Sequence, residues 1–272
     1  MNIDYSNIKI ISWNINSVRL RLNLLDKFIA QNNPDIICLQ EIKVINDLFP
    51  LAEIKNLGYN WVEFDGEKSY NGVCIISKIP LYNIKKIDIL KYGQKRYLAV
   101  DFTVKNKIYH LHNFYVPAGG DLADIYENPK FDHKIKFIDW MINYFNNKHG
   151  NHIMVGDMNI APLEHDVWSH KQLIKVVSHT PIEIEKMNKL QKTLNWIDAH
   201  RKFVDNSQKL YSWYSYRARD PLKSNRGRRL DHIWCTPNLE QNIISSQIYT
   251  NYRIEKQPSD HVPIQVNFNF CK

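Results

Sequence analysis

The chain alternates between short apolar runs and longer stretches in which apolar residues recur three or four positions apart. The short runs are typical of buried strands, and the longer stretches are typical of amphipathic helices. The pattern predicts strands at residues 8–13, 36–39, 72–77, 99–104, 108–113, 152–155, 230–235, 243–249 and 263–270. It predicts helices at residues 22–30, 131–145 and 182–194.

These elements follow one another without a visible domain boundary. No run rich in Gly, Ser or Pro separates them, and no internal repeat is present. Many strands with interspersed helices favour packed sheets that are covered by helices. We therefore expect residues 1–272 to form one domain of the α/β class.

Charge and composition narrow the class of protein. The 272 residues include 36 Lys+Arg and 28 Asp+Glu, and the formal net charge of +8 favours a polyanionic partner. No apolar run reaches the ~18–20 residues of a membrane span, and the first residues lack the basic and apolar regions of a signal peptide. We therefore expect a cytoplasmic protein that does not bind membranes.

The four cysteines are widely spaced and form no CxxC pair. They are Cys38, Cys74, Cys235 and Cys271, most of them within apolar runs. This pattern is typical of buried reduced thiols rather than of a structural zinc site.

Polar residues stand where several predicted strands end. They are Asn14, Glu41, Asp157 with Asn159, Asp231, and Asp260 with His261. Side chains at rigid strand ends can be aimed at one point, and sites are often built there. A set dominated by Asp, Glu and Asn oxygens suits a hard cation such as Mg²⁺ or Mn²⁺ better than zinc.

Each of these residues also has an ordinary structural interpretation when it is taken alone. An Asp or Asn after a strand commonly hydrogen-bonds its own turn. Asp231 could simply pair with Arg229 or Arg217, and Tyr115 could fill the core with a satisfied hydroxyl. The functional interpretation therefore depends on the residues acting together.

Six motifs in a fixed order favour the functional interpretation. They are WNIN at 13–16, LQEIK at 39–43, NFYVP at 113–117, GDMNIAP at 156–162, NRGRRLD at 225–231 and SDHVP at 259–263. In these motifs the chain resembles the exonuclease III family of apurinic/apyrimidinic endonucleases, of the bacterial type, within the endonuclease/exonuclease/phosphatase superfamily. The resemblance runs from Ile8 to Phe268. It implies a DNase I-like four-layer αββα sandwich with two mixed sheets packed face to face.

The resemblance also implies a role for each polar residue. Glu41 is the expected main magnesium ligand, and the expected metal site comprises Asn14, Glu41, Asp157, Asn159, Asp260 and His261. Asp157 is expected to orient and deprotonate the attacking water, and Asn159 to hold Asp157 and a phosphate oxygen. His261, tethered by Asp231, and Tyr115 are expected to donate to the transition state or to the leaving side.

A basic segment follows in the last third of the chain. Residues 217–231 hold Arg217, Arg219, Lys223, Arg226, Arg228 and Arg229, next to the aromatic residues of 211–216. Such a run can be a solvated surface, but Arg with aromatic residues is also what nucleic-acid binding needs. By resemblance, Trp213 packs on an abasic sugar, and Arg217, Arg226 and Arg228 contact DNA. Arg228 stands where relatives often carry an apolar wedge.

The loop at residues 163–171 is bulky and contains His165 and His170 beside acidic residues. Without a Cys or a third clustered His, a zinc site there is disfavoured. The resemblance places this loop at the edge of the DNA groove.

The resulting functional prediction is a magnesium- or manganese-dependent DNA-repair phosphodiesterase. It is expected to act as a monomer on double-stranded DNA, cleaving 5′ to abasic sites and trimming blocked 3′ ends. A superfamily phosphodiesterase for an RNA tail or a lipid headgroup is the alternative. A catalytically inactive nucleic-acid-binding module is disfavoured, because Asp157, Asn159 and His261 are all present.

Overall fold

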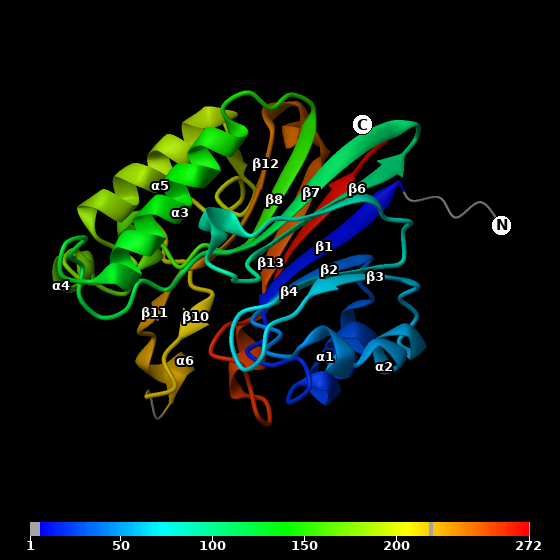
Figure 1. Cartoon of the computed structure of the whole chain (residues 1–272), viewed down its shortest axis with the longest axis horizontal. Coiled ribbons are helices and arrows are strands. Elements are labelled where there is room, and N and C mark those ends of the chain that lie inside the picture. Colours follow the sequence, from blue (N-terminus) through cyan, green and yellow to red (C-terminus); the bar gives the residue numbers. More distant parts are fainter. Residues whose placement is uncertain (1–5, 218–219, 272) are drawn as a thin grey trace.

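A computed structural model describes residues 6–217 and 220–271, and two six-stranded sheets dominate it (Figure 1). The first sheet has the order β13 (Ile243–Ile248), β14 (Ile264–Asn269), β1 (Asn7–Asn14), β2 (Ile36–Gln40), β4 (Val73–Ser77) and β3 (Trp61–Asp65). The second has the order β5 (Tyr82–Lys86), β6 (Tyr97–Val104), β7 (Lys107–Tyr115), β8 (Asn151–Asp157), β12 (Asp231–Cys235) and β9 (Ile197–Asp198). Both sheets mix parallel and antiparallel pairs.

Helices cover the outer face of each sheet. The longer ones are α1 (Leu22–Asn32), α3 (Pro129–Phe145) and α5 (Pro181–Thr193), and the shorter ones are α2 (Leu51–Asn56), α4 (His170–Leu173) and α6 (Pro221–Ser224). In Figure 1, α3 and α5 lie together on the side of β8 and β12, whereas α1 and α2 lie beneath β1–β4. The predicted four-layer sandwich is confirmed.

Strict alternation along the strands creates the layers. In β1, Ile8 and Ile10 enter the core between the sheets, whereas Ile11 and Trp13 face the opposite way and pack with Phe28 of α1. Successive side chains of a strand point to opposite faces, so a strand covered on both sides is apolar throughout. This explains why the central strands are visible as continuous apolar runs in the sequence.

The edge strands β3, β5 and β9 of the two sheets were not predicted, and neither were the two-residue strands β10 (Trp213–Tyr214) and β11 (Gly227–Arg228). β3 is only partly buried, and four of the five residues of β5 are exposed. Edge strands face solvent and carry polar or charged side chains, so their apolar signal is weak. The nine predicted strands and the three predicted helices are all present, with boundaries that differ by a few residues.

The core between the sheets becomes polar at one end. In β8, Ile153 and Val155 occupy this core, and the next residue on the same face is Asp157. In β12, Ile233 and Cys235 occupy it, and the residue on the same face at the start of the strand is Asp231. The polar residues of several strands therefore gather at one edge, between the two sheets.

A small two-stranded ribbon closes this edge. It consists of β10 (Trp213–Tyr214) and β11 (Gly227–Arg228), with Trp213 opposite Arg228. Trp213 also forms a bridge with His261, and Tyr214 N donates to Asp260 O at 2.8 Å. The aromatic part of the basic segment is thereby fixed beside the polar edge of the sheets.

Two further sequence expectations have structural outcomes. Cys38, Cys74 and Cys235 are buried, but Cys271 lies at the surface, so the prediction of a buried thiol is wrong for that residue. Cys271 follows the last strand, where the chain leaves the core. In the described ranges, no helix is both long enough and apolar enough to cross a membrane.

Candidate active site

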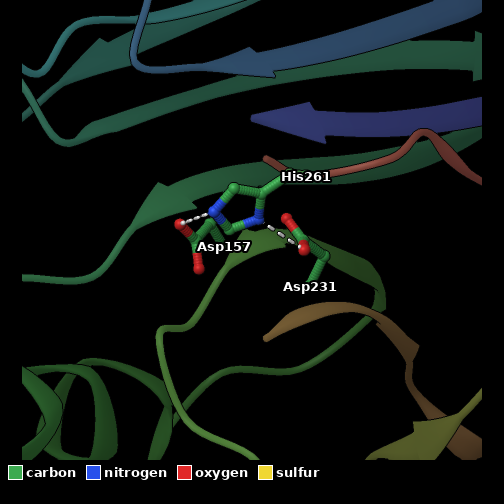
Figure 2. A group of neighbouring side chains, drawn as sticks. All are labelled: Asp157, Asp231 and His261. Carbon is green, nitrogen blue, oxygen red and sulfur yellow. Dashed lines mark hydrogen bonds and ion pairs between the residues drawn. The ribbon is translucent and has the colours of Figure 1, made fainter. Parts of the chain in front are cut away.

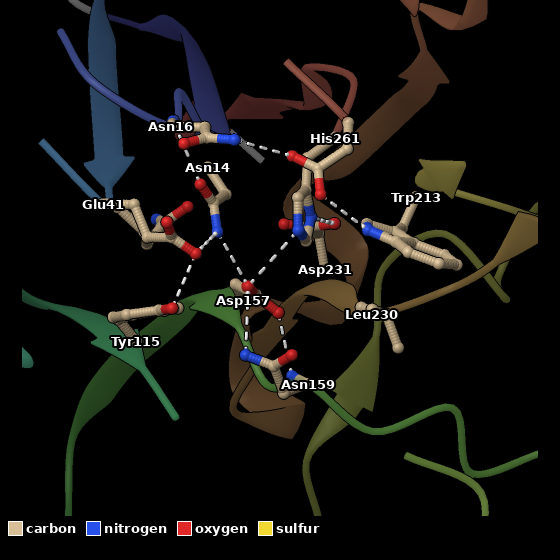
Figure 3. Close-up of polar contacts among 12 residues, drawn as sticks. Asn14, Asn16, Glu41, Tyr115, Asp157, Asn159, Trp213, Leu230, Asp231 and His261 are labelled. Atoms are coloured by element: carbon tan, nitrogen blue, oxygen red, sulfur yellow. Dashed lines mark hydrogen bonds and ion pairs between the residues drawn. The ribbon is translucent and has the colours of Figure 1, made fainter. Parts of the chain in front are cut away.

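The side-chain amide of Asn14 joins the two sheets at their polar edge (Figure 3). Asn14, at the end of β1, donates from Nδ2 to Glu41 Oε1 at 3.0 Å and to Asp157 Oδ2 at 2.9 Å. Asn14 and Asp157 are fully buried. Because an amide nitrogen has two protons, this arrangement uses both of them and fixes the relative position of two carboxylates.

Glu41 is held by three different donors. Besides Asn14, Tyr115 OH donates to Oε1 at 2.6 Å, and Lys43 Nζ lies 2.6 Å from Oε2. Burial alone would raise the pKa of Glu41, but Lys43 and the hydrogen bonds outweigh it and lower the pKa. Glu41 and Lys43 both have positive φ, at 51° and 52°, so the chain after β2 bends sharply and points both side chains to the site.

Asp157 ends β8 and is oriented by its neighbour Asn159. Asn159 N donates to Asp157 Oδ1 at 2.8 Å, and Asn159 Nδ2 lies 3.2 Å from Oδ2. Burial raises the pKa of Asp157 to about 7, with His261 opposing and Asp231 adding to the shift. The preceding Gly156 has φ +142°, and a Cβ there would lie 2.0 Å from Phe114 O, so no larger residue fits.

His261 lies between two aspartates (Figure 2). Its Nδ1 is 2.8 Å from Asp231 Oδ2, and its Nε2 is 3.6 Å from Asp157 Oδ2. Burial alone would lower the pKa of His261, but Asp231 and Asp157 outweigh it and raise the pKa well above its usual value. The site therefore favours a protonated imidazole that can donate from Nε2.

Asp231 pairs with His261 and not with an arginine. Its Oδ2 also accepts from Ser212 Oγ at 2.6 Å, whereas Arg229 pairs with Asp166 and Asp198. The simple pairing of Asp231 with Arg229 is therefore wrong. Ser212 was not among the predicted site residues, although it directly precedes Trp213, which was.

Asp260 faces the other side of the site. Its Oδ2 accepts from Trp213 Nε1 at 3.0 Å, and its Oδ1 accepts from Asn16 Nδ2 at 3.1 Å. Asn16 Oδ1 in turn accepts from Lys43 Nζ at 2.7 Å. Asn16 and Lys43 were missed as site residues, although both lie within the WNIN and LQEIK motifs.

The donor set fits a hard divalent cation. Glu41 and Asp260 line one pocket and offer carboxylate oxygens, while Asn14 and Asn16, which bond them, offer amide oxygens. The lining residues of this pocket include no cysteine. Lys43 places an ammonium group between Glu41 and Asn16, so positive charge is already favoured at this point. Asp157, Asp231 and His261 form a second compact group, with ligand atoms within 4.8 Å of one another. Asp231 and His261 bind each other there, which leaves Asp231 Oδ2 engaged.

The predicted DNA-binding residues lie at different depths. Arg228 is half-buried, with its guanidinium 5.4 Å from the Trp213 ring, and Arg226 stacks 4.8 Å from the Trp168 ring. Arg217 is exposed, whereas Arg229 is buried away from the surface in its ion pairs. Arg219 lies outside the described residues. The basic segment therefore provides both surface and pocket cations.

Among the described residues, those of the loop at 163–171 belong to no cluster of three or more His, Cys, Asp or Glu side chains. His170 Nδ1 lies 2.8 Å from His179 Nε2, whose ring in turn contacts Ala161 O through Nδ1 at 2.6 Å. These contacts join the loop to the segment before α5. His170 thus has a structural partner.

A pocket of about 340 Å³ opens beside the reacting groups. Its polar end contains Glu41, Asn159 and His261, and its apolar walls contain Trp213 and Leu230. A second cavity of about 530 Å³ continues past Glu41 and Tyr115 to basic groups that include Lys43, Arg96 and Lys130. The site is therefore an open groove with a side pocket, rather than a closed chamber.

Comparison with known proteins places this arrangement in a family. A model described as the Endonuclease/Exonuclease/phosphatase family matches residues 11–261, and the chain belongs to this family. It is 31% identical over 278 residues to exodeoxyribonuclease III of Haemophilus influenzae, covering 96% of this chain and 100% of that protein.

Solved structures show the same fold at nearly full length. An AP endonuclease from Archaeoglobus fulgidus is 28% identical with a TM-score of 0.87, covering 96% of this chain and 99% of that one. A 3′ phosphatase from Neisseria bound to a product DNA hairpin is 27% identical with a TM-score of 0.87 and the same coverage. The predicted family is confirmed.

Proposed function

We propose that this protein is a DNA-repair phosphodiesterase that hydrolyses DNA 5′ to abasic sites and removes blocking groups from 3′ ends. The observation that carries the proposal is the convergence of Asp157 and His261, whose nearest atoms are 3.6 Å apart, at an open groove. A base and an acid this close can act in one hydrolysis, the base on the attacking water and the acid on an oxygen of the phosphate. The nuclease relatives and the DNA-bound structural neighbour support DNA as the substrate.

Asp157 is the proposed base. Asn14 and Asn159 fix its carboxylate, so one oxygen can accept a proton from a water molecule in the groove. The water oxygen attacks phosphorus, and the bond from phosphorus to the 3′ oxygen breaks. Because the attacking and leaving oxygens must lie in line, the rigidity of Asp157 sets the direction of attack.

His261 and Tyr115 are the proposed donors. Asp231 holds the His261 ring by Nδ1, which leaves Nε2–H to stabilise charge on a phosphoryl oxygen. Tyr115 OH, now bonded to Glu41, lies at the edge of the same groove, where it can donate to the leaving oxygen. Asn159 Nδ2 gives its two protons to Val116 O and Asp157 Oδ2, so a contact with a phosphate oxygen would use the proton that Asn159 now shares with Asp157.

Glu41, Asp260 and the nearby amides of Asn14 and Asn16 are the proposed holders of a magnesium or manganese ion. A bound divalent ion supplies charge neutralisation for the phosphate, which the acids of the site would otherwise repel. Asn159 and His261 line the same groove, and Asp157 lies directly behind them, within hydrogen-bond reach of Asn159 and 3.6 Å from His261. These three residues complete the proposed metal site.

Trp213, Arg217 and Arg226 are the proposed DNA contacts outside the reacting centre. Trp213 forms an apolar wall of the pocket and is fixed by its bond to Asp260, so it can pack on a sugar that lacks its base. Arg226 and Arg217 are exposed and can neutralise phosphates along the duplex. We further propose that the monomer is the active form and that Mg²⁺ is the working metal.

The test is to incubate the protein with duplex DNA that carries one abasic analogue, with and without Mg²⁺, and to map the new ends. The proposal expects a single cut 5′ to the abasic position, with a 3′ hydroxyl on one side. Parallel reactions with a 3′-phosphate end, an RNA tail and a phospholipid headgroup test the alternative. Hydrolysis of the RNA or lipid substrate alone would replace the DNA-repair assignment with the other superfamily activity.

A further inference from the structure

A lysine occupies an apolar position on helix α3. Lys134 lies three residues after Phe131 and four before Ile138, and both of these neighbours are buried. The Lys134 side chain is also fully buried, and its ammonium group pairs with Glu183 of α5 at 2.5 Å. A buried ion pair is often no more stable than two apolar side chains of similar size. Stability alone therefore does not explain why a charge stands at this position.

The ammonium group of Lys134 binds three separate segments of the chain. Besides its pairing with Glu183, Nζ donates to Ala118 O at 3.2 Å and to Asn159 O at 2.8 Å. An ammonium group has three protons, and this arrangement uses all of them. A neutral side chain offers at most two protons from one atom, so no neutral residue could hold the same three acceptors.

Both backbone acceptors lie just beyond groups of the candidate active site. Ala118 comes three residues after Tyr115, which ends β7. Asn159 comes two residues after Asp157, which ends β8. The two strands are neighbours, and side chains of α3 pack on both of them (Figure 1). Lys134 thus ties the two loops at the groove to the helix layer behind them.

Asn159 has a backbone conformation that needs such restraints. Its φ is +52°, in the left-handed region that few residues other than Gly adopt. Its N–H donates to Asp157 Oδ1 at 2.8 Å, and its O accepts from Lys134 Nζ. The peptide groups on the two sides of Asn159 are therefore both held, one by Asp157 and the other by Lys134. Strained backbone of this kind persists where the surroundings over-determine it.

The loop after β7 also packs on the methylene stem of Lys134. Gly119 has φ +91°, and a Cβ there would lie 2.9 Å from Lys134 Cδ and 3.0 Å from Val177 Cγ1. A larger residue would therefore be strained and would press on the lysine stem. The loop is thus held by the apolar part of Lys134 at Gly119 and by its charged end at Ala118.

We propose that Lys134 is a positioning residue for hydrolysis, which holds Asn159 and through it fixes the carboxylate of Asp157 in the direction that the attack requires. The inference rests on the proposed function, in which Asp157 is the base. Without the bond from Lys134, the peptide after Asn159 can rotate, and the N–H that orients Asp157 Oδ1 can turn away. The attacking water then loses its fixed partner, while the surfaces that contact DNA stay as they were.

The test separates stability from geometry by neutralising the whole ion pair. Lys134→Met with Glu183→Gln leaves no charge at this position, so its urea midpoint should recover toward that of the parent. Its single-turnover rate on abasic duplex should still fall about 10- to 100-fold, since a small misplacement of a reacting group is costly. Its affinity for the same duplex should stay within about threefold of the parent, because Lys134 is fully buried and cannot touch DNA.

Lys186→Met is the matched control. Lys186 of α5 pairs with Asp139 of α3, so this pair joins the same two helices. Among the hydrogen bonds and ion pairs of the described residues, Asp139 is the single partner of Lys186. The control should therefore leave the cleavage rate at the parent value. Urea unfolding of every variant gives its folded fraction, and rates are expressed per folded molecule.

A second readout shows whether Lys134 acts through Asp157. The neutralised pair is introduced into Asp157→Asn, in which no base remains to be positioned. In this background the pair should have little further effect on the residual rate, because residues that act as one unit are not additive. A residue that only supports the fold would lower the rate by the same factor in both backgrounds.

Three outcomes would overturn the inference. They are a parent rate in the neutralised pair, a loss in affinity without a loss in rate, and an equal loss of rate with and without Asp157. Any of these, in a protein whose parent form cuts abasic duplex, would reject the role of Lys134 and leave the proposed function intact. A parent protein that hydrolyses no DNA would reject the proposed function itself, and the inference with it.

Discussion

Asn14 Nδ2 lies 2.9 Å from Asp157 Oδ2 and joins the end of β1 in one sheet to the end of β8 in the other. The proposed base is therefore positioned by the sheet opposite its own. Because the same amide also binds Glu41, any movement of one sheet relative to the other changes the distance between the metal side and the base side of the site. The geometry of the site therefore depends on how the two sheets pack against each other.

Removal of divalent metal should abolish hydrolysis. The oxygen-rich group around Glu41 and Asp260 contains no soft ligand, so Mg²⁺ or Mn²⁺ should restore the rate after chelation. The measurement is cleavage of abasic duplex after exhaustive chelation, with elemental analysis of the protein and then a metal titration. Undiminished cleavage by metal-free protein would contradict the assignment.

Asp157→Asn should bind DNA at least as well as the parent but react much more slowly. The change removes a negative charge beside phosphate, yet it also removes the proposed base, so the rate should fall about 10²–10⁴-fold. Single-turnover cleavage gives the rate, and fluorescence anisotropy with abasic duplex gives the affinity. Asp26→Asn, the same chemical change at an exposed position of α1, is the control for handling and folding. A rate within a few-fold of the parent would show that Asp157 is not the base.

Trp213→Ala should impair damage recognition more than general DNA binding. If the ring packs on a baseless sugar, its loss should cost ~1–3 kcal/mol, or about 5- to 150-fold, on abasic duplex. Binding to an intact duplex of the same sequence should change little. The comparison is made by anisotropy on both duplexes across a salt series, and equal losses on the two would refute the role of Trp213 as a damage reader.

Lys134→Met should destabilise the fold strongly. The ion pair between Lys134 and Glu183 is fully buried, and removing one partner leaves an uncompensated charge, at a cost of about 3–5 kcal/mol. The double variant Lys134→Met with Glu183→Gln should recover much of this loss, because no buried charge remains. Urea unfolding of the parent, both single variants and the double variant measures the coupling. Additive losses in the double variant would contradict the predicted coupling.

The stability that two buried histidines contribute should fall as the pH drops below neutrality. Burial lowers the pKa of His200 and of His232 from 6.5 to about 4, so the unfolded chain binds protons between these values and the folded chain does not. The contribution of each histidine is thus complete above 6.5 and declines as the pH falls toward about 4, by ~1 kcal/mol at pH 5.5. The raised pKa of Asp157 acts in the opposite direction, so the comparison with a histidine variant isolates the histidine contribution. Urea midpoints at pH 7.5, 6.5 and 5.5 test this. A His200→Leu variant should show a shallower decline, and an identical slope would be the contrary result.

The sequence predicted the central elements because their environment is uniform. Strands covered on both faces are apolar throughout, and the polar residues that end them, such as Asp157, interrupt the pattern visibly. Edge strand β5 has no such signal, since most of it is exposed. Boundaries of individual strands shifted by a few residues for the same reason, because strand ends are where burial changes.

Pairings between distant residues could not be predicted in this way. Lys134 is a polar residue inside the apolar helix pattern at 131–145, and nothing near it in the sequence indicates that Glu183 meets it. The same holds for Ser178, whose contact with Arg228 joins residues 50 positions apart. Asn16 and Lys43 lie within the WNIN and LQEIK motifs, so the sequence offered some indication of them. Asn14 and Glu41 in the same motifs were chosen instead, because they stand directly at the strand ends.

The division of the site between two sheets has a consequence for the misfolded chain. Asn14 and Glu41 come from one sheet, whereas Tyr115, Asp157 and Asp231 come from the other. Neither half contains the complete set of proposed hydrolytic groups, so the proposed reaction requires both sheets to be folded and packed together. A chain whose sheets have not yet packed should therefore bind no substrate in a reactive geometry and show no hydrolysis.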